Sequence, residues 1–190
     1  MVVVAETNLH RPKLILVTGP SRSGKSRWAE SLVSDFKCVT YIATSPTRPD
    51  DEAWQQRILL HRRRRPPHWT VLESGPELMQ AVHQIDSSEQ DHAVLIDALG
   101  GFVAAHLDQD NQNWQQLTDQ LSVCLTTMKQ TIVLVVEETG WGVVPPTAIG
   151  GLFRDRLGQL GQRLNDQADE SWLVVQGRAL NLHQLGFPVP

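Results

Sequence analysis

The chain has 190 residues, of which 41% are hydrophobic and 20% charged, the size and balance of one ordinary α/β domain. The formal net charge of −4 argues against a general nucleic-acid-binding protein, and no apolar run approaches the ~20 residues that span a bilayer. Cys38 and Cys124 form no CxxC pair and have no histidine at zinc-ligand spacing, which excludes a disulfide scaffold. We expect a cytoplasmic protein with a loose leader at residues 1–12 and a single domain over residues 13–190.

From residue 13 onward, strand-like and helix-like segments alternate along the chain. Short β-rich apolar runs predict buried strands at residues 13–18, 39–43, 93–96, 131–136 and 171–175. Apolar periodicity, or acids at the start and arginines at the end of a segment, predicts helices at residues 25–36, 50–64, 114–128 and 148–168. Short loops are expected at residues 45–49, 87–90 and 140–146. The alternation indicates βαβ units and therefore an α/β fold with a mostly parallel sheet flanked by helices.

The segment that joins the first strand to the first helix matches the Walker A pattern GxxxxGK[ST]. It reads Gly19-Pro20-Ser21-Arg22-Ser23-Gly24-Lys25-Ser26. Glycines let such a backbone wrap closely around phosphates, and its N–H groups and the following helix N-terminus supply positive potential. The lysine reaches the β- and γ-phosphates, and the serine hydroxyl coordinates Mg²⁺. A Gly-rich turn that matches by chance is the alternative, but the flanking strand and helix favour a P-loop for a nucleoside triphosphate.

An aspartate follows a later apolar run, as in a Walker B strand. Residues 93–96 are Ala-Val-Leu-Ile, and Asp97 comes directly after them. Such a strand delivers a carboxylate to the edge of the sheet where the P-loop lies, so Asp97 could hold Mg²⁺ together with Ser26. The alternative is an aspartate that simply begins the next loop.

A histidine lies inside a cluster of arginines at the end of the predicted helix 50–64. On a helix Arg57, His61 and Arg65 are four residues apart and share one face. Neighbouring positive charges favour a neutral imidazole, which carries a nucleophilic lone pair, and guanidinium groups bind phosphate oxygens in pairs. The cluster therefore suits attack on a phosphate ester through a phosphoramidate intermediate. A solvated basic helix end or a localisation-type basic patch explains the same spacing equally simply.

Two acidic groups are weaker candidates. Glu137 and Glu138 follow the predicted strand 131–136 and precede a Gly turn, where carboxylates could meet a ligand or could be two exposed acids. The acids at residues 50–52 could hold Mg²⁺ but are more simply favoured by the dipole of the helix they begin. The remaining histidines without a partner pattern are expected to be surface or packing residues: His10, His83, His92, His106 and His183.

Taken together, these residues resemble the bifunctional adenosylcobinamide kinase / adenosylcobinamide-phosphate guanylyltransferase family of cobalamin biosynthesis, over about residues 14–177. The Walker A pattern alone is shared by many enzymes. The specific features are Tyr41-Ile42-Ala43-Thr44, Arg57-Ile58 followed by His61, and the turn Gly140 to Pro145, in this order and spacing. Further matches are Arg65-Pro66, His68-Trp69, Glu73, Phe153-Arg154-Asp155 and Ala168-Asp169-Glu170.

The resemblance implies a RecA-like P-loop NTPase fold, a homotrimer and two reactions. The first phosphorylates adenosylcobinamide with ATP or GTP, and the second transfers GMP from GTP to the product, giving adenosylcobinamide-GDP through a GMP-histidine intermediate. The family's histidine falls on His61. Its nucleotide contacts fall on the loop from Gly19 to Ser26 and on Thr44, Ser45, Arg62, Arg63, Arg64, Arg65, Glu73 and Asp97.

Five positions depart from the family pattern. Ala53 stands where glutamate is expected, Glu137 and Gly161 stand where asparagine is common, and Gly100 and Gly101 lie in a stretch that often carries threonine and asparagine. These positions are expected near the corrinoid or the phosphoryl acceptor, so they bear on the kinase step and not on guanylyl transfer.

Two other functions fit the P-loop. The first is a kinase of another small molecule, in which His61 only binds substrate. The second is a nucleotide-binding partner protein without catalysis or a RecA-like DNA-associated ATPase, and the acidic net charge argues against the DNA-associated form.

Overall fold

The computed structural model describes residues 11–46, 50–85, 91–142 and 146–189, except the side chains of residues 54 and 57. Its strands are β1 (Leu14–Gly19), β2 (Cys38–Ala43), β3 (Thr70–Glu73), β4 (His92–Asp97), β5 (Thr131–Glu137), β6 (Glu170–Val175) and β7 (Arg178–Asn181). Its helices are α1 (Lys25–Leu32), α2 (Glu52–Arg64), α3 (Leu78–His83), α4 (Leu99–Ala105), α5 (Asn111–Thr127), α6 (Ala148–Asn165) and α7 (Leu182–Leu185).

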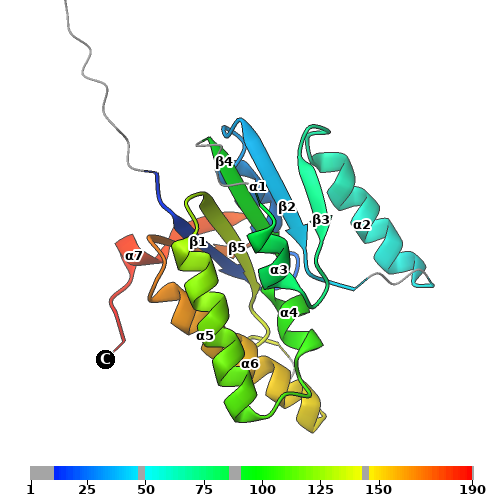
Figure 1. Ribbon diagram of the computed structural model, residues 1–190, viewed down its shortest axis with the longest axis vertical. Coiled ribbons are helices and arrows are strands. Elements are labelled where there is room, and N and C mark those ends of the chain that lie inside the picture. The colour runs from blue at the N-terminus through cyan, green and yellow to red at the C-terminus, as the bar shows by residue number, and fades with distance from the viewer. Residues whose placement is uncertain (1–10, 47–49, 86–90, 143–145, 190) are drawn as a thin grey trace, which may run out of the picture.

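The strands form one sheet in the order β3-β2-β4-β5-β1-β6-β7 (Figure 1). Every neighbouring pair is parallel except β6 and β7. β5 therefore lies between β1, which leads into the P-loop, and β4, which ends at Asp97. Because carboxyl ends of parallel strands meet at one edge, the loops after β1, β2, β4 and β5 gather there.

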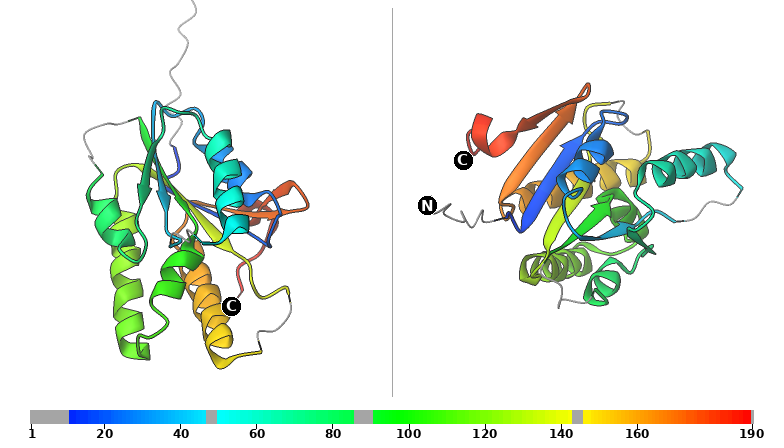
Figure 2. Two further views of the ribbon diagram at one scale, coloured as in Figure 1. Left: turned by 90° about the vertical axis from the view of Figure 1, so that its right-hand side faces the viewer. Right: turned by 90° about the horizontal axis from the view of Figure 1, so that it is seen from above.

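Helices cover both faces of the sheet (Figure 2). Each covered face has its own apolar core. One core joins Leu16, Ile96 and Leu134 of the strands to Phe102 and Leu157 of the helices. The other joins Val17, Leu95 and Val135 to Ala29 of α1 and the tryptophan that follows α2. Alternate side chains of each central strand thus enter opposite cores, which is why these strands are continuous apolar runs.

The predicted mostly parallel α/β fold is confirmed, with two kinds of difference in detail. The helix predicted at residues 25–36 ends at Leu32, because Ser34 and Phe36 make tighter i→i−3 turns while Val33 and Phe36 still pack in the core. The short elements β3, α3, α4, β7 and α7 were not predicted, since four to seven residues carry too little periodicity.

Residues 1–10 of the predicted leader and parts of the predicted loops 45–49, 87–90 and 140–146 lie outside the described residues. Within the described part of the chain, no helix combines the length and the apolar character needed to cross a membrane.

Candidate nucleotide-binding and catalytic site

The Walker A segment forms a tight loop between β1 and α1. Gly24, at the N-terminus of α1, has φ +104°, a left-handed conformation that glycine adopts without strain. Backbone bonds anchor the loop: the carbonyl of Gly19 accepts from Glu138 N at 2.9 Å, and the carbonyl of Ser23 accepts from Gly177 N at 3.0 Å. Lys25 is buried, and its Nζ donates to the carbonyl of Pro20 at 3.2 Å. The loop is thus held in the geometry that surrounds a phosphate.

Beside this loop lies a cavity of about 320 Å³, which we call the nucleotide pocket. Its lining comes from β2, β3, the last residues of β4 and β5, the loops after β1, β2, β4 and β5, and the helices α1 and α2. The lining residues are Ser21, Lys25, Tyr41, Ala43, Ser45, Ile58, His61, Arg62, Arg65, Val71, Glu73, Asp97, Ala98, Glu137, Glu138 and Thr139. Eight of the sequence-predicted site residues therefore surround one space: Ser21, Lys25, Ser45, His61, Arg62, Arg65, Glu73 and Asp97.

His61 lies near the end of α2 among the predicted arginines. Arg64 Nη2 is 3.3 Å from His61 Nδ1 and 3.1 Å from Glu30 Oε1. A guanidinium only donates, so the contact requires the lone pair on Nδ1 and places the proton of the neutral imidazole on Nε2. Burial raises the pKa of the Glu30 carboxyl, and Arg64 lowers it. The predicted face of Arg57, His61 and Arg65 is described only in part, since the Arg57 side chain lies outside the described residues.

Arg65 and Tyr41 join the arginine cluster to Asp97. The Arg65 guanidinium lies 3.7 Å above the centre of the Tyr41 ring, and its Nε donates to the carbonyl of His61 at 3.1 Å. The Tyr41 hydroxyl donates to Asp97 Oδ2 at 3.1 Å. Burial, with the charge of Asp97, raises the pKa of Tyr41 far above its usual range, so the phenol stays a donor. Arg65 Nη1 is buried without a hydrogen-bond partner, and a ligand oxygen could supply one.

Glu137 reaches the pocket from the end of β5. Its Oε2 accepts from the N–H of Gly100 at 2.8 Å, in the first turn of α4. The N-cap of this helix is Ala98, whose side chain cannot accept a hydrogen bond. Glu137 therefore takes the place of a capping residue and accepts from one of the free backbone N–H groups in the first turn. Burial raises the pKa of Glu137, and the Gly100 hydrogen bond lowers it less. A Cβ on Gly100 would lie 2.7 Å from Oε2, which explains the glycine.

The remaining predicted residues do not line the pocket. The Thr44 hydroxyl is buried and donates to the carbonyl of Ala98, and a Cβ on Gly101 would collide with it. Arg63 is exposed on α2, and Ala53 is exposed at the start of that helix. The other predicted residues that are not among the lining residues belong to the Walker A loop, to α1 or to α2: Gly19, Pro20, Arg22, Ser23, Gly24, Ser26 and Arg64.

Among the histidines without a partner pattern, the packing expectation fits His92. It is buried and its Nε2 lies 2.9 Å from the Thr40 hydroxyl. His10 lies outside the described residues.

Tyr41 and Val71 were not predicted as site residues. Tyr41 is the single tyrosine of the chain and the one hydroxyl-bearing aromatic residue in a predicted buried strand, which is a usable signal. Val71 lies on β3, a strand too short to predict.

The residues present fit a magnesium ion held mainly by a nucleotide. Within the described residues, no group of three or more His, Cys, Asp and Glu side chains gathers as a metal site. Mg²⁺ is usually bound by one or two protein oxygens together with substrate phosphates and water. Asp97 in the pocket and Ser26 at the start of α1 are oxygen donors of this kind.

A parallel sheet with this loop and this pocket defines a P-loop nucleotide-binding protein, and solved structures share the fold. A type III secretion system ATPase from pathogenic bacteria superposes with a TM-score of 0.57 at 13% identity. The match covers 93% of this chain and 59% of that chain. A protein of Pyrococcus horikoshii OT3 superposes with a TM-score of 0.53 at 8% identity, over 90% of this chain and 85% of that one.

Sequence relatives define the family. Residues 15–182 match the family described as cobinamide kinase / cobinamide phosphate guanyltransferase. The chain is 36% identical over 179 residues to the bifunctional adenosylcobalamin biosynthesis protein CobU of Escherichia coli K12, covering 86% of this chain and 96% of the relative. It is 33% identical to CobP of Pseudomonas aeruginosa, a protein of the same description, covering 88% and 95%. The chain belongs to this transferase family, as its motifs predicted.

Proposed function

We propose that this chain phosphorylates adenosylcobinamide with ATP or GTP and then transfers GMP from GTP to adenosylcobinamide phosphate. Membership of the family supports both activities. The observation that carries the proposal is the nucleotide pocket, which brings Lys25 and Ser21 of the P-loop together with His61, Arg62 and Arg65 of the arginine cluster. A P-loop kinase needs no histidine among arginines at that place.

In guanylyl transfer, His61 is the nucleophile. A ring nitrogen forms a bond to the α-phosphorus of GTP, the bond from that phosphorus to the oxygen bridging to the β-phosphate breaks, and pyrophosphate leaves with the electron pair. An oxygen of adenosylcobinamide phosphate then attacks the same phosphorus, and the nitrogen recovers its lone pair. Arg64 donates to Nδ1 at 3.3 Å, so attack through this atom requires Arg64 to take a phosphate oxygen as its partner instead.

In the kinase step, the acceptor hydroxyl attacks the γ-phosphorus, the nucleoside diphosphate leaves, and the hydroxyl proton passes to solvent. Lys25 binds the β- and γ-phosphates, and the loop from Gly19 to Ser26 surrounds them with N–H donors. Asp97 and Ser26 would hold Mg²⁺, which neutralises charge on the phosphates. Tyr41, which donates to Asp97 Oδ2, orients that carboxylate.

The roles of Thr44, Ser45, Glu73 and the remaining arginines as GTP contacts belong to the same proposal. So does the organisation of residues 13–190 as one catalytic domain, acting as a homotrimer in the cytoplasm. Size-exclusion chromatography with light scattering of the full chain tests the trimer.

The test of the chemistry is incubation with Mg²⁺ and GTP labelled on the α- or the γ-phosphate, followed by denaturing electrophoresis. We expect an acid-labile α-label on the wild-type protein. His61→Ala should lose the label and bind GTP within a few-fold of wild type, whereas His83→Ala, at the end of α3 and away from the pocket, should keep it.

The possible outcomes separate the functions. A His61→Ala protein that no longer binds GTP makes His61 a binding or structural residue. γ-Phosphate turnover without an α-label indicates a small-molecule kinase. Nucleotide binding without turnover of either label, with adenosylcobinamide present, indicates a binding protein.

A further inference from the structure

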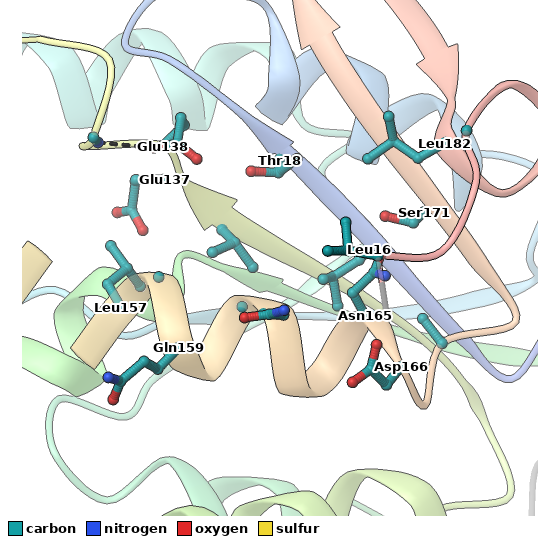
Figure 3. Close-up of a pocket in the computed structure, with 18 of the residues that line it drawn as sticks. Leu16, Thr18, Glu137, Glu138, Leu157, Gln159, Asn165, Asp166, Ser171 and Leu182 are labelled. Carbon is teal, nitrogen blue, oxygen red and sulfur yellow. Dashed lines mark hydrogen bonds between the residues drawn. The ribbon is translucent and has the colours of Figure 1, made fainter. Parts of the chain in front are cut away.

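A second, larger cavity borders the nucleotide pocket. We call it the acceptor groove: about 1040 Å³ between α6, the neighbouring faces of β1 and β6, and residues 186–189 after α7 (Figure 3). Pockets for drug-sized ligands occupy about 300–1,000 Å³, so the groove suits a ligand larger than most. The two cavities share Glu137, Glu138 and Thr139 in their linings. A ligand in the groove would therefore reach the phosphates of a nucleotide bound next to it.

The helix α6 presents two different stripes. Leu157, Leu160 and Leu164 are buried in the core. The groove is lined by Leu157 and by a second stripe of residues three, four and seven positions apart: Gly158, Gly161, Gln162 and Asn165. Glycine lowers the stability of a helix, and a Cβ on Gly158 would have nothing within 4 Å. Helix propensity explains neither interior glycine; a Cβ on Gly161 would lie 3.4 Å from Cγ1 of Val136, and the absence of both side chains leaves this side of the groove open.

The groove combines apolar surface with neutral polar groups, and charged side chains also line it: Glu137, Glu138, Arg154, Asp155 and Asp166. Leu16, Val136 and Leu157 supply apolar walls, and the amides of Gln162 and Asn165 and the hydroxyl of Ser171 lie among them. In Figure 3, Leu16 and Ser171 face Asn165 of α6 across the groove. At its outer end, Phe187 is 95% exposed and Val189 is 84% exposed, which leaves large apolar side chains uncovered beside the opening.

We propose that the acceptor groove binds the corrin ring of adenosylcobinamide and directs its hydroxyl-bearing side arm past Glu137 to the nucleotide pocket. The inference rests on the proposed function. A corrinoid is a large apolar macrocycle rimmed by neutral primary amides, and amides pair with the amide and hydroxyl groups of the groove. The shared lining lets a single bound corrinoid present its arm to the γ-phosphate, and afterwards present the arm's phosphate to the guanylyl group.

The test compares two identical substitutions on one helix. Gly158→Leu fills the groove, while Gly151→Leu, also with nothing within 4 Å of its Cβ but outside the groove lining, leaves it open. Cobinamide binding is measured by equilibrium dialysis, using the visible absorbance of the corrinoid. We expect Gly158→Leu to weaken cobinamide binding by roughly tenfold or more and Gly151→Leu to change it by less than about twofold. Both should keep GMP labelling of His61.

A second variant tests whether a polar side chain of the groove recognises the ligand, without filling the groove. Gln162→Leu keeps nearly the same volume and removes the amide, so the KM for cobinamide should rise several-fold with the KM for GTP unchanged. If the Gly158→Leu protein binds cobinamide as tightly as wild type, the groove inference is overturned and the proposed function is not. The inference is also overturned if Gly158→Leu, but not Gly151→Leu, changes the oligomeric state, because the groove would then be a contact between copies of the chain. A wild-type protein that binds no cobinamide would overturn the proposed function as well.

Discussion

The contact between Glu137 and Gly100 yields a double-mutant prediction whose sign changes with the background. In wild type, a Cβ at position 100 would lie 2.7 Å from Oε2 and 2.8 Å from Oε1 of Glu137. Gly100→Ala therefore displaces the carboxylate and loses its 2.8 Å bond to the Gly100 N–H. A hydrogen bond to a charged group contributes about 1.5–3 kcal/mol to the free energy of unfolding. Replacing glycine by alanine in a helix raises this free energy by up to about 1 kcal/mol. Gly100→Ala should therefore lower the free energy of unfolding by about 1–2 kcal/mol in total.

In a Glu137→Ala background, the same Gly100→Ala change has no carboxylate to displace, and it should stabilise the protein by up to about 1 kcal/mol. The coupling energy between the two sites is then about 2–3 kcal/mol. Urea unfolding of the four proteins, followed by circular dichroism, measures it. Equal destabilisation by Gly100→Ala in both backgrounds would show that some other group occupies the space, and the capping role of Glu137 would be refuted.

Three further predictions follow from neighbouring contacts. Tyr41→Phe removes the hydroxyl that donates to Asp97, so GMP labelling of the protein should slow by roughly tenfold and should require a higher Mg²⁺ concentration. The affinity for GTP should stay nearly unchanged. Labelling at the wild-type rate at low Mg²⁺ would contradict this role of Tyr41. Gly158→Ala should raise the stability by up to about 1 kcal/mol and Tm by about 2–4 °C in calorimetry, because its Cβ meets no atom within 4 Å. Burial raises the pKa of the Glu137 carboxyl above its usual range, so the folded state binds this proton more tightly than the unfolded state and loses stability as the pH rises from the unfolded pKa through the folded one. Urea midpoints of Glu137→Gln and wild type should therefore diverge as the pH rises above the ordinary pKa of a glutamate, about 4.3, with the variant gaining stability relative to wild type. Midpoints that stay parallel over this rise would contradict the raised pKa of Glu137.

The sequence predicts the central part of the fold because its strands are buried on both faces. Residues in β1, β4 and β5 enter two cores, so each reads as an apolar run bounded by polar segments. The edge strands lack this pattern: β3 has mostly exposed residues, and β7 alternates between exposed residues and half-buried or buried ones. The positions of β3 and β7 depend on their pairing with β2 and β6. A pattern within a few consecutive residues does not predict such pairing.

The acceptor groove could not be predicted from local patterns either. Its residues come mainly from β1, β5, α6, β6, α7 and the segment after α7, so the cavity exists only once these elements are assembled. The departures from the family pattern gave a partial signal. Glu137 and Gly161 line the groove, and Gly100 lies beneath the carboxylate of Glu137. Their shared location becomes visible only in three dimensions.

The two halves of the nucleotide pocket differ in what holds them, and this explains why one was predictable. The P-loop follows a buried strand and begins α1, so core packing fixes Lys25 relative to the sheet. The helix α2 has no buried side chain among its described residues, and it is attached through polar contacts of Arg62 with Glu73 at 3.0 Å and Arg64 with Glu30 at 3.1 Å. The Arg62–Glu73 pair is exposed, and exposed ion pairs contribute about 0–1 kcal/mol each, far less than an apolar face would. Because α2 has no apolar stripe to indicate which of its faces points inward, the sequence alone does not decide between two interpretations of His61: a catalytic residue or part of a solvated helix end. The assembled pocket, with Arg65 on Tyr41 and Tyr41 on Asp97, is what favours catalysis.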